Sequence, residues 1–167
     1  MKTKRQEGFS LIELLIVVAI IGIIAAIAIP NLLASRRAAN EGSAQSSCRT
    51  VHSAEATYQA TMGNGQFGVL LVADEPAAGQ SLRGQNLVDG VLGTGTKSGY
   101  TFSLPAANIA AGPPPTFWFS SVPANTAAIT RTGNRSFAIT EDGVLRGGVT
   151  DAVADRAAAL ALTALGN

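Results

Sequence analysis

An uninterrupted apolar stretch near the N-terminus constrains this chain more than any other feature of its sequence. From Leu14 to Ile29 every residue is Leu, Ile, Val, Ala or Gly. Counted from Phe9, the stretch has 21 residues, of which only Ser10 and Glu13 are polar. A helix of about 20 apolar residues is long enough to cross the hydrocarbon core of a bilayer. The stretch therefore predicts a membrane-spanning helix that contains one carboxylate.

Glu13 is the residue of this stretch that requires an explanation. A charge at the centre of a membrane helix costs roughly 2.5 to 3.5 kcal/mol on insertion scales, so such a residue by default indicates a function. A plain signal anchor that only holds a soluble domain to the membrane has no use for this carboxylate. We therefore set that simpler interpretation aside.

Residues 1–8 form a short polar leader that ends in Gly8. An ordinary secretory signal has its small-residue cleavage site after the apolar core, whereas here the well-placed small residue lies before it. A cut after Gly8 would leave a mature chain of 159 residues (167 − 8) with a new α-amino group on Phe9. Phe9 and Glu13 share one helix face, so this amine and the carboxylate could pair within one chain or between neighbouring chains. A pair between neighbours would neutralise two charges that are each costly alone, and Glu13 would then set the register of identical helices.

The N-terminus resembles that of the type IV pilins and the related type II secretion pseudopilins. The residues that carry the resemblance are Gly8-Phe9-Ser10-Leu11-Ile12-Glu13-Leu14 and the later Pro30. The resemblance implies cleavage between Gly8 and Phe9 by a membrane prepilin peptidase and N-methylation of Phe9. It also implies assembly of identical subunits into a helical filament through the hydrophobic segment, with Phe9 and Glu13 at the assembly contact.

The resemblance further implies where the protein is located. The precursor and the subunit pool are expected in the inner membrane, in contact with the lipid bilayer and with the pilus or secretion assembly machinery. Lys2, Lys4 and Arg5 place the C-terminal head outside the cytoplasm, because positive charge is retained on the cytoplasmic side. After assembly the subunits would lie in an extracellular pilus or in a periplasmic pseudopilus.

The rest of the sequence predicts an α+β fold. Residues 9–30 would form the transmembrane and assembly helix, in which Gly22 and Pro30 are weak points. Residues 31–62 would continue this helix as an amphipathic segment, and residues 63–167 would form a globular head. Apolar residues recur with the helical period at Ala44, Cys48, Val51, Ala54, Tyr58 and Met62, and a glycine cap follows at 63–65.

The head is expected to contain a small antiparallel sheet of about four strands that covers the amphipathic helix. Residues 66–97 are predicted to form an irregular loop with one helical turn near Pro76. Alternation and turn residues predict strands at 99–104, 116–122, 135–140 and 144–146, with a turn at 141–143. Residues 150–165 would be a short helix or a loosely ordered end, with Thr150 or Asp151 as N-cap.

We predict no catalytic, cofactor or metal site. No nucleophile, base and orienting group form a recognisable motif, so the protein is not expected to be an enzyme. Cys48 and His52 have the spacing of two metal ligands, but the chain has no other Cys or His, so we interpret Cys48 as a core residue that forms no intrachain disulfide. Trp118 is interpreted as a core residue rather than a stacking platform. Three aspartates, Asp142, Asp151 and Asp155, lack the spacing of calcium ligands and are interpreted as cap and turn residues.

The predicted function is that of a structural subunit, a pilin, in which one heterologous contact repeats without closure. The alternatives are a pseudopilin of a type II secretion system, or a minor or tip pilin that acts in adhesion or DNA binding. Nucleic acid has no support as a partner in the bulk composition, because the net charge is +1 and only 14% of the residues are charged.

We expect the membrane-held protein to begin at Phe9 with a methylated amine, because the polar leader stops at Gly8. Intact-mass measurement and N-terminal sequencing check this, and a chain that begins at Met1 or after Ala28 would contradict it.

Gly8→Leu should leave unprocessed precursor in the inner membrane, because the peptidase needs a small residue beside the bond that it cuts. Normal processing of this variant would refute that requirement.

Overall fold

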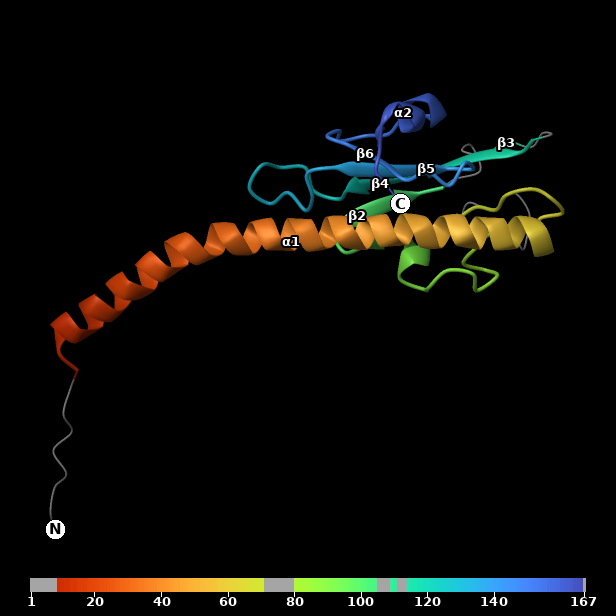
Figure 1. Ribbon diagram of the computed structural model, residues 1–167. Helices are drawn as coiled ribbons and strands as arrows, with labels where there is room; N and C mark the ends of the chain where they lie inside the picture. Colours follow the sequence, from red (N-terminus) through yellow and green to blue (C-terminus); the bar gives the residue numbers. More distant parts are fainter. Residues whose placement is uncertain (1–8, 71–79, 105–108, 111–113, 167) are drawn as a thin grey trace, which may run out of the picture. The chain divides into compact units, whose positions relative to one another are not determined.

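The computed structural model describes residues 9–70, 80–104, 109–110 and 114–166, and it confirms the α+β fold (Figure 1). The chain divides into two compact units, Met1–Arg36 and Arg37–Asn167. A long helix, α1 (Leu11–Thr61), begins in the first unit and continues in the second. In the second unit, the remainder of this helix packs on an antiparallel sheet.

The first unit is the N-terminal part of α1, which is apolar on all sides. Its large side chains from Leu11 to Ile29 are exposed by 50% or more. By length and composition, α1 is the one helix among the described residues that could cross a membrane. The helix continues without interruption through Gly22 and Pro30, so the weakness that we predict at these two residues does not end it.

The second part of α1 is amphipathic and buries one face. Five members of the predicted stripe are at most 5% exposed: Ala44, Cys48, Val51, Ala54 and Tyr58. The prediction for Met62 is wrong, because this side chain is 49% exposed and follows the last helical residue, Thr61. The predicted glycine cap is confirmed: the Gly63 N–H donates to the Tyr58 carbonyl at 2.7 Å, and Gly65 has a φ of 84°.

Seven strands are described, and all of them pair in an antiparallel sense. They are β1 (Thr96–Lys97), β2 (Tyr100–Ser103), β3 (Ile109–Ala110), β4 (Thr116–Pro123), β5 (Ser136–Thr140), β6 (Arg146–Gly148) and β7 (Thr163–Ala164). The order is β1-β2-β4-β5-β6-β7, and β3 pairs with β4. The predicted four-stranded meander corresponds to β2, β4, β5 and β6. The three additional strands have two residues each, too few to show alternation in the sequence.

The last strand of the meander lies two residues later than we predict. Residues 144–146 are the predicted strand, whereas β6 pairs Arg146–Gly148 with β5. The sequence does not indicate this strand, because two of its three residues are glycines, which have low strand propensity and show no alternating pattern. Gly147 is required there, since a Cβ atom would come within 2.9 Å of the Phe137 ring.

The main core lies between the second part of α1 and the sheet. Four aromatic side chains, Tyr100, Phe117, Phe119 and Phe137, are at most 1% exposed. The rings of Phe102 and Phe119 are stacked with centroids 5.8 Å apart. Beside this core, the Glu41 carboxylate on α1 accepts hydrogen bonds from the Asn134 N–H at 2.7 Å and from Arg135 at 3.2 Å. The loop before β5 is thereby tied to the helix.

A second, smaller core lies on the opposite face of the sheet. Here α2 (Arg156–Ala161) packs on the sheet, on the side away from the second part of α1 (Figure 1). Ala138, Val153 and Ala159 are buried, and Trp118 packs against them, which confirms its interpretation as a core residue. The N-cap of α2 is Asp155, which accepts from the Ala158 N–H at 2.7 Å. The predicted caps, Thr150 and Asp151, are too far upstream because the helix begins later than we expect.

The connection between α1 and the sheet is only partly described. The helical turn predicted near Pro76 lies outside the described residues. Farther along, the 3-10 turn η2 (Leu92–Thr94) leads into β1. Asp89 precedes this turn and accepts a hydrogen bond of 2.6 Å from the Leu92 N–H.

We expect Leu145→Ala to reduce the free energy of unfolding by about 2 to 5 kcal/mol, because it leaves a cavity at a fully buried position. Val149→Ala is the matched control. Its side chain is 82% exposed, so the change should stay within about 0.5 kcal/mol. Denaturant unfolding of the full chain in detergent measures both variants, and equal effects would contradict the burial of Leu145.

Candidate functional site

The N-terminus of α1 combines one carboxylate with a fully apolar surface. The Phe9 side chain is 93% exposed, and the side chains of Leu11 and Ile12 on the first turn are 79% and 57% exposed. The Glu13 carboxylate accepts a hydrogen bond of 2.9 Å from the backbone N–H of Ser10. A negative charge in the first turn also interacts favourably with the helix dipole.

Ser10 is a residue of this site that our sequence analysis missed. It directly precedes the first helical residue, and a Glu three positions later bonds back to its N–H, as in a capping box. The Ser-x-x-Glu spacing of Ser10 and Glu13 is the sequence pattern from which this capping role could have been predicted. Glu13 therefore has a partner within its own chain, and the donor is a backbone amide.

Glu55 is a second residue whose importance we did not predict. It lies on the buried face of α1, four residues after Val51 and three before Tyr58, and its side chain is 0% exposed. Its Oε2 atom accepts from the Gly68 N–H at 2.9 Å. Its Oε1 atom has no hydrogen-bond partner in the described part of the chain. Burial raises the pKa of Glu55 to about 8, against the lowering effect of the Gly68 hydrogen bond.

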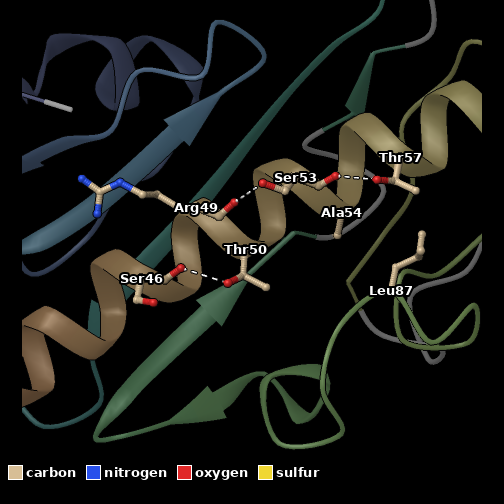
Figure 2. A pocket seen from close by; sticks show the side chains of 7 residues that line it. All are labelled: Ser46, Arg49, Thr50, Ser53, Ala54, Thr57 and Leu87. Atoms are coloured by element: carbon tan, nitrogen blue, oxygen red, sulfur yellow. Dashed lines mark hydrogen bonds between the residues drawn. The ribbon is translucent and has the colours of Figure 1, made fainter.

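Polar residues line a shallow, open hollow beside the second part of α1 (Figure 2). Three of its hydroxyl groups already donate to helix carbonyls: Thr50 to Ser46, Ser53 to Arg49 and Thr57 to Ser53, at 3.0 to 3.1 Å. The Arg49 guanidinium points away from these hydroxyls (Figure 2). These three hydroxyl donors are thus used within the helix and do not converge on a ligand.

A second open hollow lies between α1 and the turn after β5. Arg49, His52 and Ser53 line it from the helix, and Ile139 and Gly143 line it from the sheet. Gly143 has a φ of 72°, and a Cβ atom there would come within 3.1 Å of the His52 ring. His52 is therefore packed against the turn. Among the described residues no group of three or more His, Cys, Asp and Glu side chains could hold a metal ion.

The comparisons with known proteins give one family model and several relatives. Residues 3–29 match the family model of the prokaryotic N-terminal methylation motif. The chain is 63% identical over 38 residues to the type IV wide pilus major component PilA4 of Thermus thermophilus, and 44% identical over 54 residues to the type IV major pilin protein PilA of Myxococcus xanthus. It is 34% identical over 59 residues to the type II secretion system core protein G of Aeromonas hydrophila. The chain carries the N-terminus of the type IV pilin and pseudopilin family.

The similarity to these pilins and to the pseudopilin is confined to part of each chain. The aligned segments make up 23%, 32% and 35% of this chain and 29%, 24% and 41% of the three relatives. The chain thus spans less than half of the length of the relatives that it matches. The family model covers residues 3–29, within the N-terminal segment.

Phe9 and Glu13 of the prepilin motif lie within the described residues, whereas Gly8 lies outside them. The structure brings Glu13 to the Ser10 N–H. Cleavage after Gly8, methylation of Phe9 and the contact of Phe9 with Glu13 of another subunit stay predictions.

The three aspartates of the pilin-like head have separate partners. Asp142 accepts from Thr140 and pairs with Arg146 at 2.6 Å, and this pairing holds the pKa of Asp142 well below its usual range. Asp151 pairs with Arg131, and Asp155 caps α2. The hydrogen bonds agree with the interpretation of Asp142 as a turn residue and of Asp155 as a cap, whereas Asp151 forms an ion pair and caps no helix.

Cys48 is a buried residue of the main core. Its side chain is 0% exposed, and its Sγ atom lies 3.5 Å from the Ser121 hydroxyl. Burial raises the pKa of the thiol to about 12, so the thiol stays protonated and unreactive at neutral pH. This confirms Cys48 as a core residue.

We expect Gly143→Ala to lower stability by about 1 to 2 kcal/mol, because a residue with a side chain is strained at this positive φ. Gly42→Ala is the matched control with the opposite sign. Gly42 lies inside α1 with open space around it, so alanine should stabilise the helix by up to about 1 kcal/mol. Thermal unfolding of both variants tests this, and a Gly143→Ala protein as stable as wild type would show that the turn tolerates a side chain.

Proposed function

We propose that this protein is a structural subunit of a type IV pilus-like filament, assembled through its N-terminal helix after leader cleavage. The observation that supports this best is the first part of α1, which is apolar on every side and carries one carboxylate. A helix that is apolar all round must be buried by lipid or by other helices. Two proteins to which the chain is similar over 38 and 54 residues are named as a major component of a type IV wide pilus and as a type IV major pilin protein.

The proposal gives the apolar helix two successive environments. Before assembly it lies in the inner membrane, where a prepilin peptidase removes residues 1–8 and the assembly machinery takes up the subunit. In the filament, identical helices replace the lipid. One heterologous contact repeated without closure then produces a helix of subunits. No catalytic role is part of this proposal.

Glu13 has two candidate roles in this scheme, and they make different demands on its side chain. As a cap, it needs only an oxygen atom that accepts from the Ser10 N–H. As the partner of the Phe9 amine of a neighbouring subunit, it needs its negative charge. Leaving one member of a buried ion pair without its partner costs roughly 3 to 5 kcal/mol, which each added subunit would have to overcome.

We expect Glu13→Val and Glu13→Gln both to be inserted and cleaved normally but to form no filaments. Glutamine keeps the oxygen acceptor for Ser10 and removes the charge, so it separates the two roles. The measurement compares the yield of filaments with the amount of processed subunit in the membrane. Ile12→Val, which keeps the charge, is the control and should assemble as wild type does.

Two results would contradict parts of this account. Normal filaments from Glu13→Gln together with none from Glu13→Val would assign Glu13 to capping alone. Normal filaments from both variants would remove Glu13 from assembly altogether.

A pseudopilin of a type II secretion system is the second candidate function. It is favoured by the similarity to the secretion system core protein G. The two candidates differ in where the assembled subunit is found. Shearing of intact cells should release an abundant pilus subunit into the medium, whereas a pseudopilin should stay with the cell envelope. A minor or tip pilin would appear in the sheared fraction in small amounts.

A further inference from the structure

Residues 67–70, which we call the return segment, pack against the end of α1. The chain turns at Gly63 and Gly65, after which a Cβ atom on Gly68 would lie 3.2 Å from the Tyr58 ring. The return segment is also bonded to the rest of the head, because Leu70 donates to the Leu104 carbonyl at 3.1 Å. Val69 and Leu70 are each 1% exposed. The segment is therefore part of the main core.

The Glu55 carboxyl group forms a side-chain hydrogen bond between α1 and the return segment. Its Oε2 atom accepts from the Gly68 N–H at 2.9 Å, inside the core. The other oxygen, Oε1, is buried without a hydrogen-bond partner in the described part of the chain. A buried carboxylate with one unsatisfied oxygen is costly, whereas a protonated carboxyl group carries no net charge.

The surroundings of Glu55 supply no counter-charge among the described residues. On α1, the ionisable neighbours one turn away are His52 and Tyr58. Residues 67–70 contain no ionisable side chain. On the sheet side, the ring of Phe117 lies 4.6 Å from that of Phe67 and 6.2 Å from that of His52. Burial is the largest cause of the raised pKa of Glu55, and no charged side chain contributes to it.

We propose that Glu55 is a proton-operated clasp, which holds the return segment against α1 as a neutral acid and releases it when the proton is lost. In the closed head, a carboxyl oxygen can accept from the Gly68 N–H whether or not the group is protonated. The charge on the ionised group, however, must be solvated, and water can reach it only if the return segment moves away from the helix.

The direction of the pH effect follows from the two pKa values. The ordinary pKa of a Glu side chain is 4.5, and burial raises the pKa of Glu55 to about 8 in the folded head. Between these values the closed state binds more protons than the open state, so closure weakens as the pH rises. The stabilising effect of the proton is complete below about pH 4.5 and is lost above about pH 8. One proton changes the opening equilibrium by up to tenfold per pH unit within this window.

Amide hydrogen exchange of the full-length protein in detergent tests the clasp. After correction for the intrinsic exchange rate, the opening equilibrium at Gly68, Val69 and Leu70 should increase by up to about 50-fold between pH 6 and pH 8 in wild type. In Glu55→Gln it should not change, because the amide keeps an acceptor for Gly68 and cannot ionise. Glu41→Gln, which removes a paired carboxylate from the same helix, should behave as wild type does.

An opening equilibrium in wild type that does not change with pH would overturn the proposal, and so would the same pH dependence in Glu55→Gln. If Glu55→Gln does not fold, a carbon-13 titration of the wild-type Glu55 carboxyl group replaces it. A midpoint well above 4.5 supports the clasp, whereas a midpoint near 4.5 overturns it. None of these results depends on whether the protein forms filaments.

Discussion

The packing of the second part of α1 on the aromatic face of the sheet is the interaction on which the rest of the head depends. Val51 and Tyr58 on the helix belong to the same buried cluster as Phe119 and Phe137 on the two central strands. Because the helix covers this face, the other face is left for α2 and Trp118. The loop before β5, the return segment and the turn at Gly143 are each held by a contact with the helix.

One helix thus serves two different surroundings. Its first part has apolar side chains on all sides and contains no core of its own. Its second part has a polar outer face, whose hydroxyl groups bond to carbonyls of the preceding turn. The change from one pattern to the other lets one helix join a folded head to a segment that is apolar on all sides and must be buried by lipid or other helices.

The parts of the fold that the sequence predicts are those with a strong period. The stripe from Ala44 to Tyr58 and the alternating strands around Phe102 and Phe119 could be located because burial imposes a repeat of 3.6 or 2 residues. β6 could not be located, because glycines leave no alternation. The two-residue strands were too short to predict. Asp155 was missed as the N-cap because the sequence alone makes Thr150 and Asp151 equally suitable N-cap residues.

The candidate site shows the same limit at the level of single residues. Glu13 stands out from the sequence because it is the one charge in an apolar run, yet its bond to Ser10 appears only in the structure. Glu55, in contrast, does not stand out from the sequence. Its position between Val51 and Tyr58 puts it on the buried face, but a carboxyl group is normally assigned to the surface. Only the folded head shows that Gly68 supplies a donor there and that the second oxygen is left without one.

The contacts that hold the C-terminal part of the head determine which solution conditions can weaken its structure. The one cysteine of the chain, Cys48, lies on α1 and is buried in the main core. The C-terminal part is held by ion pairs between Glu141 and Arg156 and between Asp151 and Arg131, together with the apolar contacts of α2. The head therefore needs no oxidant to reach its final structure, and a reducing agent leaves it intact. Concentrated salt, which screens charges at the surface, is expected to weaken the two ion pairs but not the apolar contacts of α2.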